Sequence, residues 1–197
     1  MRDGLSATVG GSLPNDMARY SHLTLSQYCV ESYQRSDHSD GNFQYINPKP
    51  DLLVFRGTDE IRDVLSDVQL ILMTRFDSHV VDLIGELVES GRLQFPITLA
   101  GHSMGAAIAQ RAGILFRKFG YQVDQIVCFA PPRIGKNKHI KRITTCYRNG
   151  NDLVTYVPWF RHQSKPIQLA HFSFRVVSRH RMSEYNHLMR KKYGLES

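Results

Sequence analysis

Short apolar runs and segments with helical periodicity alternate along much of the chain. Strand-like runs rich in Val, Ile and Thr occur at 52–55, 97–100, 123–130 and 141–149. Between or before them lie segments whose apolar residues recur at helical spacing, at 17–34, 76–90 and 104–119. Alternating strands and helices predict an α/β fold in which helices flank a mostly parallel central sheet.

Length and composition favour one globular domain over residues 1–197. The chain has 197 residues, of which 42% are hydrophobic, enough for a substantial core. The first thirty residues contain no apolar run of signal-peptide length, and no stretch of eighteen apolar residues occurs anywhere. We therefore expect a cytoplasmic protein, or a viral or bacteriophage product in the host cell.

Charge leaves several partners open. The formal net charge of +7 would favour any polyanion. Basic runs occur at 136–142 and 189–192, without a zinc-finger, RRM or bZIP pattern. We interpret these runs as solvated surface, with peripheral contact to an anionic membrane as the second reading and no nucleic-acid partner expected. The three cysteines lack CxxC spacing, which is typical of reduced thiols and not of a zinc site.

The stretch GHSMG at 101–105 lies where a predicted strand meets a predicted helix. In this context a serine can occupy a sharp turn that exposes its hydroxyl above the sheet. Gly101 and Gly105 fit such a turn, because a side chain at either position would collide with the neighbouring strand or helix. The competing interpretation is that Ser103 only caps the following helix.

A serine nucleophile needs a general base and an acid that orients the base. Where a catalytic serine occupies such a strand-to-helix turn, the acid and the histidine follow it along the chain in that order. Asp152 directly follows a predicted strand, in a turn rich in Asn and Gly. His180 lies where a strand-like segment gives way to a helix, so a base there can project over the sheet. His187 is the alternative base, whereas His171 is expected within a strand and is interpreted as structural.

Four blocks in order resemble the fungal-type class 3 lipases of the α/β-hydrolase superfamily. They are FRGTDEIRDVLSDV (55–68), ITLAGHSMGAAIAQ (97–110), FAPPRIGKN (129–137) and NDLVTYVP (151–158). Val64 stands where many members have Trp, and the context of His180 is closer to short microbial or viral members. The resemblance implies a compact α/β-hydrolase fold.

The resemblance also implies further site residues. The backbone N–H groups of Thr58 and Met104 would form the oxyanion hole, with help from the Thr58 hydroxyl. The segment EIRDVL resembles family lids, and its apolar edge consists of Ile61, Val64 and Leu65. The same edge can instead pack on the core.

The sequence thus predicts a serine carboxylic-ester hydrolase that cleaves acyl esters of lipids, as a triacylglycerol lipase, phospholipase or esterase. Ser103, Asp152 and His180 would act through an acyl-enzyme, without metal or cofactor. An acyltransferase or thioesterase could use the same acyl-enzyme. The alternative without catalysis is a silent hydrolase fold that binds lipid. Acyl-chain length, head group and oligomeric state have no signature in the sequence.

Overall fold

A seven-stranded sheet organises the protein. The computed structural model describes residues 19–39, 44–57, 75–157, 160–171 and 178–195. The strands lie side by side in chain order: β1 (His38–Ser39), β2 (Gln44–Lys49), β3 (Leu52–Phe55), β4 (Ile97–His102), β5 (Val123–Phe129), β6 (Thr144–Asn149) and β7 (Ile167–Ala170). Strands β1 to β3 pair antiparallel, and every pair from β3 to β7 is parallel. The predicted α/β class with a mostly parallel sheet is confirmed.

Two crossover helices cover one face of the sheet. Helix α3 (Arg75–Glu89) joins β3 to β4, and helix α4 (Met104–Lys118) joins β4 to β5. Because parallel crossovers are right-handed and the strand order runs in one direction, both helices must lie on the same face. They share one buried cluster with the sheet, to which α3 contributes the predicted apolar stripe of Val80, Leu83 and Leu87.

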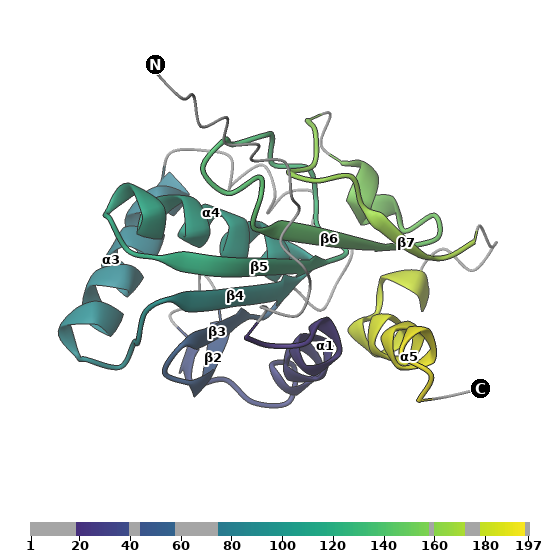
Figure 1. Ribbon diagram of the computed structural model, residues 1–197, viewed down its shortest axis with the longest axis horizontal. Coiled ribbons are helices and arrows are strands. Elements are labelled where there is room, and N and C mark those ends of the chain that lie inside the picture. The colour runs from purple at the N-terminus through teal and green to yellow at the C-terminus, as the bar shows by residue number, and fades with distance from the viewer. Residues whose placement is uncertain (1–18, 40–43, 58–74, 158–159, 172–177, 196–197) are drawn as a thin grey trace, which may run out of the picture.

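The other face is covered by helices from near the two ends of the chain. Helix α1 (His22–Glu31) and helix α5 (Met182–Lys192) lie together beside the sheet, opposite α3 and α4 (Figure 1). From α5, Met182, Tyr185 and Met189 enter a second buried cluster, at the spacing of one helical face. Helix α5 is therefore fixed against the sheet.

Three details differ from the sequence prediction. The first helix is shorter than the predicted 17–34 and begins after Ser21, whose side chain accepts from the Thr24 N–H. The pairing of β2 with β3 was missed, because the QYINPK segment of β2 is polar and contains a proline. The expectation that His171 lies within a strand was wrong, since β7 ends at Ala170 and His171 is exposed.

All three cysteines, Cys29, Cys128 and Cys146, are buried and free of disulfide bonds. Cys128 and Cys146 are direct partners on the neighbouring strands β5 and β6. In the part of the chain that the structure describes, no helix is both long enough and apolar enough to cross a membrane.

Glycines let helix α4 approach the sheet closely. A Cβ atom added to Gly105 would fall on the backbone carbonyl of Phe55 in β3, and one added to Gly101 would fall on the backbone of Gly105. These are the collisions expected from the GHSMG pattern. Gly85 in α3 differs, because an added Cβ would meet nothing within 4 Å.

We expect Gly105→Ala to lower the free energy of unfolding by about 1–3 kcal/mol, because the backbone it would strike cannot move aside as a side chain can. Gly85→Ala is the matched control and should raise the same quantity by about 0.5–1 kcal/mol, since alanine loses less backbone entropy in a helix. Urea unfolding measures both. A Gly105→Ala protein as stable as the wild type would contradict the close packing of α4 on β3.

Candidate active site

Ser103 occupies a strained turn between β4 and α4. Its backbone has φ 55° and ψ −123°, in a region that residues with a side chain rarely adopt. The Ser103 N–H donates to the carbonyl of Phe129 at the end of β5, which holds the turn over the sheet. The Ser103 side chain makes no capping hydrogen bond to α4. The interpretation of Ser103 as a plain helix cap therefore lacks its defining contact.

A chain of hydrogen bonds joins the three residues singled out from the sequence. His180 Nε2 lies 2.7 Å from Ser103 Oγ, and His180 Nδ1 lies 3.0 Å from each carboxylate oxygen of Asp152. All three residues are buried. Because a carboxylate accepts, the Nδ1–H of His180 donates to Asp152, and Nε2 is left to accept the hydrogen of the Ser103 hydroxyl. This tautomer can remove a proton from the serine.

Asp152 is held by two further donors. It is the N-cap of the short 3-10 helix η2 (Leu153–Tyr156), and its Oδ1 accepts from the Val154 N–H at 3.1 Å. Its Oδ2 accepts from the Tyr185 hydroxyl at 2.7 Å. Burial, followed by the charge of Asp152, raises the pKa of Tyr185 well above its usual value, so the phenol keeps its proton and remains a donor.

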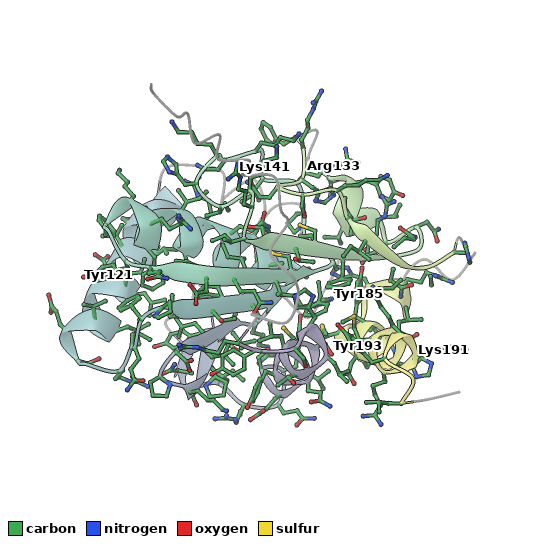
Figure 2. All side chains as sticks on the ribbon, in the orientation of Figure 1. Tyr121, Arg133, Lys141, Tyr185, Lys191 and Tyr193 are labelled. Carbon is green, nitrogen blue, oxygen red and sulfur yellow. The ribbon has the colours of Figure 1, made fainter. Side chains whose placement is uncertain are left out.

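His180 is positioned by the residues just before helix α5 and by the helix itself. His180 ends the 3-10 helix η3 (Ser178–His180), just before α5 begins, as predicted for a loop between sheet and helix. Arg179 exchanges hydrogen bonds with Asn149 at the end of β6: its Nη1 donates to Asn149 Oδ1, and its carbonyl accepts from Asn149 Nδ2. Figure 2 shows Tyr185 on α5, beneath the sheet. The contacts of Arg179 and Tyr185 thus hold the chain on either side of His180.

His102, the residue before Ser103, also supports the histidine loop. Its Nε2 lies 2.7 Å from the His180 carbonyl oxygen, and its Nδ1 lies 2.6 Å from the Tyr33 hydroxyl. Since a carbonyl only accepts, Nε2 carries the hydrogen and Nδ1 accepts from Tyr33. Burial, and then the proximity of His180, lowers the pKa of His102 well below its usual value. His102 is therefore neutral and links β4 to the loop of His180.

Of the two predicted oxyanion donors, Met104 lies among the residues that the structure describes and Thr58 does not. Met104 is the first residue of α4, where helix geometry leaves the N–H without an acceptor in the helix. Thr58 and the candidate lid residues Ile61, Val64 and Leu65 lie outside the described residues. Gly57, one residue before Thr58, is buried against the turn, and an added Cβ would lie 3.0 Å from the Cβ of Ser103.

The other histidines considered from the sequence lie elsewhere. His187 is exposed on α5, and His171 is exposed after β7. Sequence reasoning missed the supporting roles of Tyr33, His102 and Tyr185. His102 could have been noticed inside the GHSMG motif, but its partners are 69 and 78 residues away in the chain. Within the described ranges, no group of three or more His, Cys, Asp or Glu side chains is arranged to hold a metal ion.

A parallel sheet with a serine on a strained strand-to-helix turn, hydrogen-bonded to a histidine and through it to an aspartate, defines an α/β-hydrolase type of site. The family model of the class 3 lipases matches residues 70–162, which include Ser103 and Asp152 and end before His180. This match confirms the resemblance to the class 3 lipases that the motifs carry.

Two solved structures are similar to the chain. A mutant form of MDLA from Penicillium cyclopium is 17% identical, with a TM-score of 0.48, over 75% of this chain and 76% of that one. The Rhizomucor miehei lipase propeptide complex is 15% identical, with a TM-score of 0.36, over 70% of this chain and 62% of that one. None of the curated proteins matches the chain.

The depressed pKa of His102 should make stability fall in acid. The unfolded state binds a proton at this histidine below about pH 6.5, whereas the folded state resists it, so acid favours unfolding. We expect the free energy of unfolding to fall between about pH 7.5 and pH 5.5, with a contribution from His102 of at most about 1.4 kcal/mol per pH unit. Urea unfolding at several pH values measures the slope.

His102→Gln is the test of this assignment, because the amide keeps a donor and an acceptor but does not titrate in this range. Its slope should be shallower than that of the wild type below about pH 6.5. Buried His22, whose pKa burial also lowers, should still contribute to both proteins. Equal slopes in the two proteins would remove His102 as a source of acid sensitivity.

Proposed function

We propose that this protein is a serine hydrolase that cleaves carboxylic esters of lipids through a Ser103–His180–Asp152 triad. The observation that carries the proposal is the continuous hydrogen-bond chain from Ser103 Oγ through the imidazole of His180 to Asp152. The class 3 lipase match supports a lipid ester as the substrate. We further propose that residues 1–197 form one hydrolase domain.

Acylation begins at the serine hydroxyl. Ser103 Oγ attacks the acyl carbonyl carbon while His180 Nε2 takes the hydroxyl proton. The buried carboxylate of Asp152 stabilises the imidazolium that forms and keeps Nδ1–H pointed toward itself. When the tetrahedral intermediate collapses, the imidazolium gives its proton to the leaving alcohol, and the acyl group remains on Ser103. Water then attacks this acyl-enzyme with the same base and releases the free acid.

The negative charge on the former carbonyl oxygen needs donors beside Ser103. We assign this role to the N–H of Met104 at the positive end of α4, together with the N–H and hydroxyl of Thr58. The proximity of Gly57 to Ser103 supports the assignment for Thr58, the next residue. Each such donor typically contributes about 3–4 kcal/mol to lowering the barrier.

The nucleophile is tested with a fluorophosphonate, which reacts with activated serines. We expect one adduct by intact mass, located on Ser103, together with hydrolysis of p-nitrophenyl esters. Ser103→Ala should lose the adduct and slow hydrolysis by about 10⁴-fold or more. Ser90→Ala, which removes an exposed serine at the end of α3, is the control and should keep both. An undiminished rate in pure Ser103→Ala protein would refute the assignment.

The base is tested by comparing two histidines. His180→Ala should match the loss in Ser103→Ala, and the double variant should lose little more, because triad members act as a unit. His187→Ala should change kcat by a small factor at most, since this residue is exposed and sits about 10 Å further along the helix axis. The reverse ranking, in two folded proteins, would move the base to His187 and leave the hydrolase proposal standing.

A further inference from the structure

Exposed apolar side chains gather in one segment of the chain. Among the described residues, seven large hydrophobic side chains are exposed, and four of them fall between 153 and 167: Leu153, Tyr156, Phe160 and Ile167. Leu153 and Tyr156 stand three residues apart in the 3-10 helix η2, so they project on the same side. Ile167 opens the edge strand β7 as the register partner of Tyr147, so its side chain lies on the face of the sheet that α1 and α5 cover and is not part of this group. This clustering is unusual for single exposed hydrophobics, which scatter.

Arginines surround the aromatic centre of this segment. The guanidinium of Arg133 lies 5.4 Å from the centre of the Tyr156 ring, and that of Arg148 lies 4.9 Å from it. Arg148 Nε also donates to Gln168 in β7. Cations over an aromatic face are held in place by the ring quadrupole. Arg133 and Arg148 therefore form one surface with Tyr156.

Backbone contacts join the neighbouring segments into the same surface. The Arg133 N–H donates to the Val157 carbonyl, and the Gly135 N–H donates to the Arg161 carbonyl. The loop after β5 thus runs along the chain that carries Phe160 and Arg161. Figure 2 shows Arg133 and Lys141 at the same edge of the view, on the side of the sheet away from α5.

The positive charge of the protein is concentrated in this part of the sequence. Residues 130–171 contain eight Lys or Arg and one acidic residue, Asp152, a balance of +7 that equals the formal net charge of the whole chain. Asp152 is buried and bonded to His180, so it does not offset the charge at the surface. The rest of the chain has equal numbers of basic and acidic residues.

We propose that Leu153, Tyr156 and Phe160, with Arg133, Arg148, Arg161 and Lys165, form the surface by which this protein docks on an anionic lipid bilayer. Aromatic and arginine side chains suit the boundary between head groups and acyl chains, and each basic residue near an anionic leaflet adds attraction. Asp152 is the N-cap of η2, so a bilayer docked on η2 lies close to the acid of the proposed site. This inference deepens the proposed lipid hydrolase and rests on it for its purpose.

The test uses the full-length Ser103→Ala protein, so that binding is measured without hydrolysis. It is sedimented with phosphatidylcholine vesicles that contain or lack phosphatidylserine, at low and at raised salt. Binding should be stronger to the vesicles with phosphatidylserine, and this advantage should shrink as salt screens the charges. Fluorophosphonate labelling of the wild-type serine is a separate measurement, so failure of docking and failure of the hydrolase proposal are distinguishable.

Two matched pairs of variants locate the surface. Arg161→Gln with Lys165→Gln removes two exposed charges inside it, and Lys118→Gln with Lys191→Gln removes two exposed charges elsewhere, so both proteins have the same net charge. The first should weaken vesicle binding by about tenfold or more and the second by about twofold at most.

Phe160→Ser is paired with Phe119→Ser, since these phenylalanines are 51% and 47% exposed. Only Phe160→Ser should weaken binding, by about fivefold or more, because only that ring would enter the bilayer. Equal losses in the members of either pair would overturn the proposal. So would tighter binding to a DNA duplex than to phosphatidylserine vesicles at the same salt, or no binding to those vesicles. Circular dichroism of each variant confirms that it is folded.

Discussion

The strained turn at Ser103 is the feature on which the rest of the site depends. A backbone with φ 55° at a residue with a side chain costs free energy, and it persists only because neighbouring structure holds it. The holding contacts are the bond from Ser103 N–H to Phe129 and the close packing of Gly101 and Gly105. They leave the serine hydroxyl with His180 as its partner instead of the helix backbone.

The handedness of the crossovers explains why the histidine comes from the chain just before helix α5. Both right-handed crossovers beside β4 put their helices on one face, so the opposite face needs helices from outside these crossovers. Helix α5 supplies that cover together with α1, and His180, which ends η3 before the N-cap of α5, reaches back to Ser103. The same helix brings the hydroxyl of Tyr185 to Asp152. Packing and the site chemistry therefore depend on the same helix.

The polar groups of the site and the excess positive charge lie in different places in this molecule. At the site, polar groups form bonds in which each donor meets an acceptor: Tyr33 with His102, His102 with the His180 carbonyl, and Tyr185 with Asp152. Satisfied pairs of this kind avoid the cost of burying a polar group alone. The uncompensated positive charge lies instead in residues 130–171, mostly on side chains that reach the surface. One segment thus contributes both a buried acid and a basic exterior.

Local patterns in the chain were enough to predict the fold class, the order of the main strands and helices, and the residues Ser103, Asp152 and His180 as a candidate set. The alternation of apolar runs and the glycines at the turn can be recognised from neighbouring residues. The order of Ser103, Asp152 and His180 along the chain is the one known for such sites. The β1–β3 hairpin edge and the end of β7 before His171 depended on tertiary structure, as did the contact between Ser103 and the His180 that the sequence had favoured over His187. So did Tyr33, His102 and Tyr185, because each contacts partners far away in the chain, and such contacts follow from how helices pack on the sheet and leave no local pattern.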